Sequence, residues 1–140
     1  MILYLDTSAL IKLYVEEEAS DAVRAAVDRA STVAASRLAY VEARAALARA
    51  RREARIGLRD LRRAVMEFQE DWGCFFVVEV NAELARRAGE LAEEHALRAY
   101  DALQLASALT VQRRLGAEVR FLAFDENLSG AARSAGLTVS

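Results

Sequence analysis

Short apolar runs alternate with longer amphipathic stretches along the whole chain. The short runs predict β-strands at residues 2–5, 32–35, 75–78, 119–124 and 137–139. The stretches between them have helical periodicity and predict helices at 9–15, 20–29, 37–55, 58–72, 82–95, 100–115 and 128–135. Strands that alternate with helices form a parallel sheet covered by helices on both faces. The sequence therefore predicts an α/β fold.

Length and composition indicate one domain. The 140 residues are 54% hydrophobic, enough to bury a core without disulfides, and no linker or change of composition divides residues 1–140. The single cysteine, Cys74, has no intrachain partner, and its position before an apolar run predicts that it is buried. No run approaches the roughly 18 apolar residues of a membrane span, and the amino terminus does not resemble a signal peptide. We expect a cytoplasmic protein with no membrane partner.

The helices predicted at 37–55 and 58–72 form a hairpin near Gly57 that carries half of the arginines of the chain. The net charge of the chain is −2, which excludes a polycation but not a local basic face. Between residues 44 and 63 of the hairpin, eight arginines face only two acids, Glu53 and Asp60; the arginines are Arg44, Arg49, Arg51, Arg52, Arg55, Arg59, Arg62 and Arg63. This excess fits contact with a phosphate backbone, and equally a solvated face that pairs with an acidic partner.

Four carboxylates stand where a solvated acid is least expected. Asp6 and Asp125 each follow an apolar run at the carboxyl end of a predicted strand, whereas Glu42 and Asp101 lie within mainly apolar helical stretches. Ligands of open parallel sheets bind beyond the carboxyl ends of the strands. All four side chains can therefore point into one cleft at the same edge of the sheet.

Clustered carboxylates repel each other unless a positive charge balances them. Two of them about 4 Å apart repel by on the order of 4 kcal/mol at an effective dielectric constant near 20, so four would protonate or disperse without a cation. Oxygen ligands without histidine or cysteine favour Mg²⁺ or Mn²⁺ over Zn²⁺, and a water on such a metal can attack a phosphodiester. Taken singly, an acid after a strand is often a helix N-cap and a helical glutamate is usually solvated. The four positions together favour a metal site.

Four segments carry a resemblance to a known family. They are residues 5–14, which read Leu-Asp-Thr-Ser-Ala-Leu-Ile-Lys-Leu-Tyr; Glu42 in its helix; residues 100–106, which read Tyr-Asp-Ala-Leu-Gln-Leu-Ala; and residues 121–128, which read Phe-Leu-Ala-Phe-Asp-Glu-Asn-Leu. In this order and spacing the chain resembles, over essentially its whole length, a PIN-domain ribonuclease of the VapC toxin type. Members often carry histidine where Gln104 stands, a position that is not a metal ligand in the family pattern.

The resemblance implies a three-layer α/β/α domain whose parallel five-stranded sheet has the order 3-2-1-4-5. It also implies Mg²⁺- or Mn²⁺-dependent endonucleolytic cleavage of RNA, such as tRNA or rRNA, and inhibition by a VapB-like antitoxin. By position, Asp6 and Asp101 would be the principal metal ligands, and Glu42 and Asp125 would complete the acidic site. Ser8 would support the site through its hydroxyl, with Thr7 as a further helper and Asn127 as a further polar ligand.

Other functions fit the sequence less well. A phosphatase of the haloacid dehalogenase type needs a second aspartate where Ser8 stands, a receiver domain needs a lysine near the last strands, and no glycine-rich phosphate loop follows any strand. Flap-type DNA nucleases are larger. The alternative that stays open is a catalytically silent PIN-fold module that binds RNA or protein. We also expect a homodimer, formed through an apolar stripe of the hairpin that includes Tyr40 and Trp72.

Overall fold

Five parallel strands form the centre of the molecule. The computed structural model describes all 140 residues, and the strands run in the order β3-β2-β1-β4-β5, as the family resemblance predicts. They are β1 (Ile2–Leu5), β2 (Thr32–Ser36), β3 (Phe76–Val78), β4 (Val119–Leu122) and β5 (Thr138–Val139). Every pair in the sheet is parallel, with β1 at its centre between β2 and β4. The chain turns to one side of β1 for β2 and β3 and to the other side for β4 and β5, which is the topology that creates a ligand site beside the central strand.

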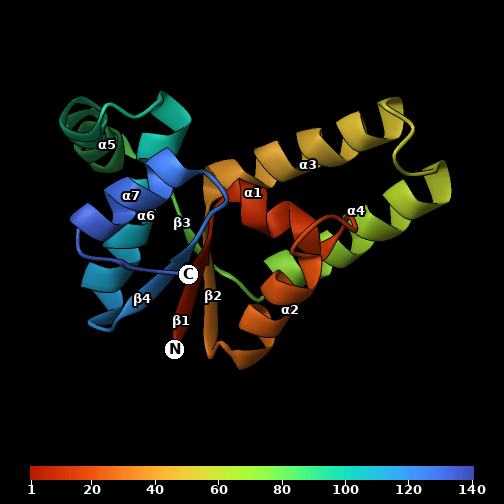
Figure 1. Ribbon diagram of the computed structural model, residues 1–140, viewed down its shortest axis with the longest axis horizontal. Coiled ribbons are helices and arrows are strands. Elements are labelled where there is room, and N and C mark those ends of the chain that lie inside the picture. Colours follow the sequence, from red (N-terminus) through yellow and green to blue (C-terminus); the bar gives the residue numbers. More distant parts are fainter.

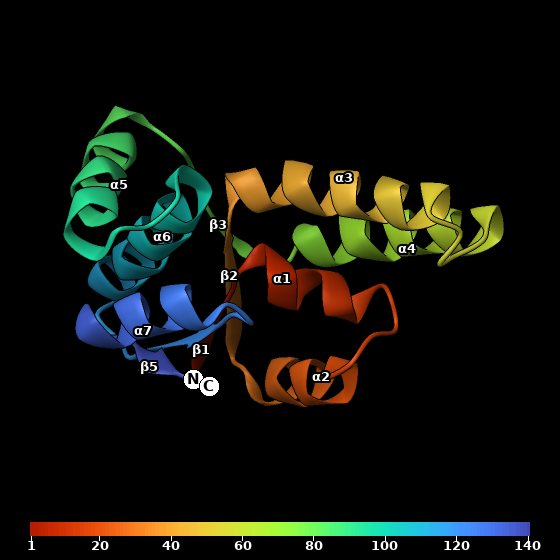
Figure 2. The ribbon, with the colours of Figure 1, turned by 45° about the horizontal axis from the view of Figure 1, so that its top comes forward.

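Helices cover both faces of this sheet, which gives the three layers that were predicted (Figures 1 and 2). On one face lie α5 (Ala82–His95), α6 (Ala99–Leu115) and α7 (Glu126–Ser134); on the other lie α1 (Thr7–Leu10), the 3₁₀ turn η1 (Ile11–Leu13), α2 (Ser20–Arg29), α3 (Arg37–Arg52) and α4 (Leu58–Trp72). Alternate residues of β1 divide between the two layers. Tyr4 packs in the core under α5 to α7, while Leu3 and Leu5 pack in the core under α2 to α4.

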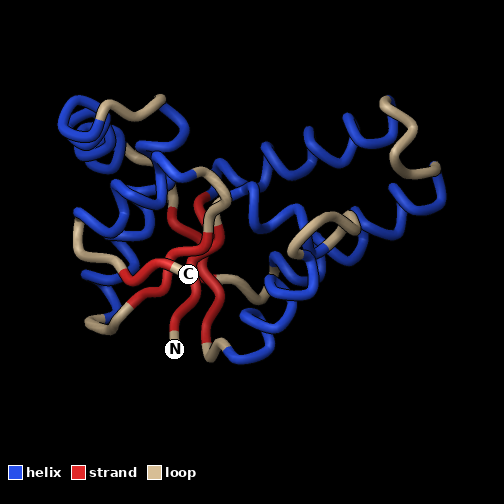
Figure 3. Tube along the Cα trace, in the orientation of Figure 1, coloured by secondary structure: helices blue, strands red, loops and turns tan.

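The helical hairpin projects from the body as a long arm made of α3 and α4 (Figure 3). A small core of Val15, Leu47 and Ala64 holds the arm against the loop after η1. At its base an aromatic cluster contains Phe68, Tyr40 and Trp72, whose ring centroids lie 5.3 to 5.5 Å apart. Trp72 is buried in this cluster, so its ring is not available for the dimer stripe in which we expected it.

Several predicted boundaries were wrong by a few residues. The first helix begins at Thr7 rather than at residue 9 and changes to a 3₁₀ turn, and α3 ends at Arg52. The fourth strand stops at Leu122, two residues earlier than predicted, so Phe124 is half-exposed instead of buried. Cys74 was expected in the core, but it is exposed in the turn after α4. No helix has the length and apolar character that a membrane span requires.

Candidate active site

The site lies at the carboxyl edge of the sheet, where β1 and β4 end side by side. Leu5 is paired with Leu122, and the ladder continues one step further because the Asp6 amide donates to the Leu122 carbonyl at 3.1 Å. Asp6 is the last residue before α1 and is only 7% exposed. The apolar strand β1 therefore places a buried carboxylate at the edge of the sheet where the connections from the central strands turn to opposite sides.

Ser8 connects this carboxylate to the loop after β4. Its hydroxyl donates to Asp6 Oδ2 at 2.8 Å and accepts a hydrogen bond from the Phe124 amide at 3.1 Å. The pKa of Asp6 is raised above its ordinary value chiefly by burial, and the hydrogen bonds from Ser8 and the Thr7 backbone oppose that shift. The negative charges of Asp101 and Glu42 raise the pKa further, so these carboxylates lie within each other's electric field. The supporting role predicted for Ser8 agrees with this geometry.

Glu42 enters the site from α3 and is held by a buried chain of hydrogen bonds. Glu42 Oε1 accepts from Thr7 Oγ1 at 2.8 Å and from Gln104 Nε2 at 3.1 Å. Gln104, only 1% exposed, in turn accepts from the Tyr4 hydroxyl at 2.6 Å. Gln104 had no predicted role, although an amide on the buried side of an otherwise apolar helix is a signal that it has a specific partner.

Asp101 and Asp125 are joined by Arg98, a cation for which no role was predicted from the sequence. Arg98, at the N-cap of α6, places its Nε 3.1 Å from Asp101 Oδ2 and a terminal nitrogen 3.6 Å from Asp125 Oδ2. The other oxygen of Asp125 accepts from the Leu128 amide at 2.9 Å and so caps α7. The spacing of Arg98 and Asp101, three residues apart in the first turn of a helix, is the signal that would have revealed this pair.

The structure thus brings all four predicted acids to one edge of the sheet. They are held in three groups: Thr7 and Gln104 hold Glu42, Ser8 holds Asp6, and Arg98 bridges Asp101 and Asp125. No three Asp, Glu, His or Cys side chains approach closely enough to hold a metal ion in this arrangement. A guanidinium instead compensates two of the carboxylates. The donor set of the four side chains is carboxylate oxygen throughout, which is the ligand chemistry that Mg²⁺ and Mn²⁺ prefer.

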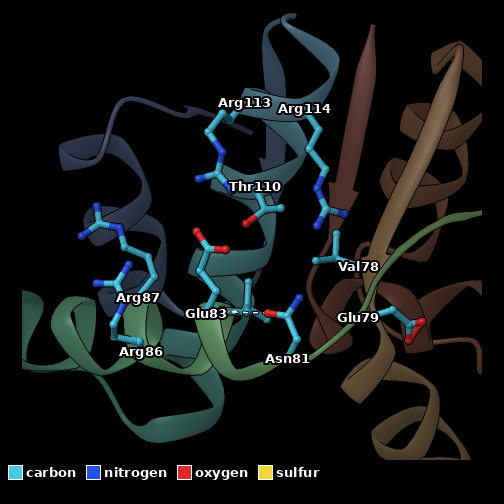
Figure 4. A pocket seen from close by; sticks show the side chains of 10 residues that line it. Val78, Glu79, Asn81, Glu83, Arg86, Arg87, Thr110, Arg113 and Arg114 are labelled. Carbon is cyan, nitrogen blue, oxygen red and sulfur yellow. Dashed lines mark hydrogen bonds between the residues drawn. The ribbon is translucent and has the colours of Figure 1, made fainter.

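A separate pocket of about 60 Å³ lies between the start of α5 and the end of α6 (Figure 4). Four arginines line it, namely Arg86, Arg87, Arg113 and Arg114, and none of the four site carboxylates does. Glu83 points its carboxylate into the pocket toward Thr110 (Figure 4). Because an acid of the protein already lies among these guanidinium groups, the pocket is not a ready anion site.

Comparison with known proteins agrees with the fold and the motifs. A model of the PIN domain family matches residues 3–134. Ribonuclease VapC45 of Mycobacterium tuberculosis is 41% identical over 110 residues, which cover 79% of this chain and 76% of that protein, and Ribonuclease VapC49 of the same species gives the same values.

Solved structures with low sequence identity share the architecture. The crystal structure of VapC20 of Mycobacterium tuberculosis, a toxin that cleaves the sarcin-ricin loop, has a TM-score of 0.67 at 23% identity and covers 97% of this chain and 96% of its own. A toxin–antitoxin complex from Klebsiella pneumoniae has a TM-score of 0.56 at 19% identity, with coverage of 84% and 83%. At these identities the likeness establishes the fold alone.

Proposed function

Since this chain belongs to the PIN-domain family and is related to the VapC ribonucleases, we propose that it is a toxin that cleaves RNA endonucleolytically with the aid of Mg²⁺ or Mn²⁺. One observation carries the metal part of this proposal. Burial raises the pKa of Asp6, and the negative charges of two further carboxylates, Asp101 and Glu42, raise it more. Asp101 and Asp125 also share one exposed cation, Arg98. Such an arrangement is electrostatically unfavourable unless positive charge is brought to it.

Asp6, Glu42, Asp101 and Asp125 are the residues that would hold the metal ion. When bound, Mg²⁺ or Mn²⁺ supplies a more acidic water and offsets negative charge on the phosphate. The protein's own contribution is orientation. Ser8 fixes the Asp6 carboxylate by a 2.8 Å hydrogen bond, and Thr7 with Gln104 fixes Glu42, so the ligands keep their directions when the ion pairs with Arg98 open.

The partners follow from the relatives and from the charge of the arm. A substrate such as tRNA or rRNA fits the nuclease relationship and the five arginines of the arm that make no ion pair, which are Arg44, Arg51, Arg52, Arg59 and Arg62. A VapB-like antitoxin fits the toxin–antitoxin complex that shares this fold. A homodimer and a cytoplasmic location remain parts of the proposal, the former through exposed apolar side chains of the arm such as Val41 and Met66.

Metal-dependent thermal stability tests the proposal directly. Mn²⁺ at 100 times its dissociation constant should stabilise the wild-type fold by about 2.7 kcal/mol, and the Asp101→Asn variant should lose this gain because one ligand is removed. Asp28→Asn is the matched control, since Asp28 is an exposed acid of α2 without an ion pair. Cleavage of RNA should follow the same pattern and stop in excess EDTA. Full cleavage in EDTA, or equal stabilisation of both variants, would reject the metal mechanism.

Arg98 should compete with the metal for the carboxylates. Exposed ion pairs contribute up to about 1 kcal/mol, so replacing Arg98 with alanine should tighten Mn²⁺ binding about two- to fivefold, measured by calorimetry or by Mn²⁺ electron paramagnetic resonance. Arg113→Ala, at the opposite end of the same helix, should leave the affinity unchanged. Weaker Mn²⁺ binding by Arg98→Ala would mean that Arg98 organises the acids for the metal instead of competing with it.

The alternative function is an RNA- or protein-binding module without catalysis. It predicts that purified protein binds RNA but leaves it intact with Mg²⁺ and with Mn²⁺. The presence of all four carboxylates at one edge, with two of them oriented by hydrogen bonds, favours the enzyme.

A further inference from the structure

Phe124 is a large aromatic side chain that is 47% exposed beside the acidic site. It directly precedes Asp125, and its backbone amide donates to the same Ser8 hydroxyl that binds Asp6. Its position is therefore fixed to the two carboxylates that end β1 and β4. The ring lies beyond the end of β4 at Leu122, and the protein covers it only in part.

Lys12 covers one side of the ring. Its Nζ lies 4.7 Å from the centroid of Phe124, which is within the range of a cation–π contact. Lys12 cannot move freely, because the same ammonium donates to Glu17 Oε2 at 3.2 Å and to the Glu18 carbonyl at 2.9 Å, and its side chain is only 12% exposed. The ring is thus supported by an ordered cation, while Phe124 as a residue stays 47% exposed.

An exposed aromatic ring beside the proposed RNA-cleaving site is suited to bind a nucleobase. Unpaired nucleobases stack on aromatic side chains, which contributes about 1–3 kcal/mol per base, whereas bases within an RNA helix are already stacked on each other. Asp101 is likewise preceded by an exposed aromatic residue, Tyr100. An exposed aromatic side chain therefore stands directly before each of the two acids that share Arg98.

We propose that Phe124 stacks an unpaired nucleobase adjacent to the phosphate that is cleaved, with Lys12 supporting the ring from behind. The substrate class is then a single-stranded RNA segment or a loop with a base turned outward, not a continuous duplex. This inference rests on the proposed ribonuclease function and adds to it a residue that determines substrate specificity.

Stacking can be measured without cleavage. A short single-stranded RNA that contains 2-aminopurine, bound to the Asp101→Asn chain, should lose fluorescence through stacking on Phe124. Adding Phe124→Ala should restore the fluorescence and weaken binding about 5- to 150-fold, the equivalent of the stacking energy, whereas Phe124→Tyr should retain both signals. Leu115→Ala removes a comparably exposed apolar side chain elsewhere and should change neither. A duplex RNA of the same sequence should bind equally to the Asp101→Asn chain with Phe124 and to the chain that also carries Phe124→Ala.

The outcomes separate this inference from the function on which it depends. If the wild-type chain cuts no RNA with Mg²⁺ or Mn²⁺, the ribonuclease proposal fails. If the wild-type chain cuts RNA and Phe124→Ala keeps the wild-type affinity and the quenched fluorescence, only the stacking inference fails. A Phe124→Ala variant that cuts duplex and single strand with the same reduced rate would also overturn it, because the loss would then be unrelated to an unpaired base.

Discussion

Replacing Asp6 with asparagine should lower the rate of RNA cleavage about 100- to 1000-fold, the loss typical when one group that stabilises transition-state charge is removed, and should make the metal-free fold more stable. The two effects have one cause. The Asp6 carboxylate is buried near the negative charges of Asp101 and Glu42. Its ionised form therefore destabilises the fold unless a cation is bound. Asparagine keeps the size and an oxygen that can accept from Ser8, but it carries no charge.

The stability effect has a defined pH dependence. Burial, with smaller effects from Asp101 and Glu42, raises the pKa of Asp6 in the folded state. A group with a raised folded pKa contributes stability that is complete below its unfolded pKa, about 4 for aspartate, and that is lost as the pH rises through the folded value. Chemical denaturation in EDTA should therefore show Asp6→Asn to be more stable than wild type at pH 7, with the difference vanishing near pH 4.

Asp28→Asn serves as the control for this experiment because Asp28 is exposed. It should keep full cleavage, and its stability should follow that of the wild type at both pH values. An Asp6→Asn protein that cleaves RNA normally would remove Asp6 from the metal site. A variant that is inactive but less stable at pH 7 would show that ionised Asp6 supports the metal-free fold, contrary to the direction of its pKa shift.

The sequence predicted those parts of the site that depend on strand ends. Apolar runs locate β1 and β4, and parallel pairing then brings the residues that follow, Asp6 and Asp125, to the same edge. Glu42 and Asp101 were predicted as site residues because each is an acid within a mainly apolar helical stretch. The sheet order came from the family resemblance, because residue patterns alone do not say which strands are neighbours.

Contacts between distant residues were not predictable from local patterns. Arg98 is an ordinary surface cation until the chain brings Asp125 beside it, and Phe124 looks like one more residue of an apolar strand until β4 ends at Leu122. The wrong prediction for Cys74 has the same origin. It borders the apolar run of β3, but the turn that ends α4 faces it outward.

Gln104→Leu should be the most destabilising single change at the site. It leaves the Tyr4 hydroxyl, in a fully buried side chain, without its 2.6 Å acceptor, at a cost of roughly 1–3 kcal/mol for an unsatisfied buried group. It also removes the amide that donates to Glu42 and Thr7. We therefore expect lower stability in denaturant and, because outer hydrogen-bond partners orient metal ligands, RNA cleavage and Mn²⁺ affinity reduced about 10- to 100-fold.

The double variant Tyr4→Phe/Gln104→Leu separates the structural role from the positioning role. Removing both partners leaves no buried group without a hydrogen bond at this contact, so most of the lost stability should return. Glu42 still lacks the Gln104 donor, so cleavage and Mn²⁺ affinity should stay low. Tyr14→Phe is the matched control, since the Tyr14 hydroxyl donates to Asp71 at 2.7 Å, away from the four acids.

The double variant decides what Gln104 does, because stability and metal affinity respond to different halves of its amide. The carbonyl oxygen satisfies Tyr4, and the amino group holds Glu42. If stability and cleavage return together, Gln104 only fills the core and Glu42 is oriented adequately by Thr7 alone. If stability returns while Mn²⁺ affinity stays low, the buried chain from Tyr4 through Gln104 to Glu42 is the means by which the interior of the sheet fixes the direction of a metal ligand.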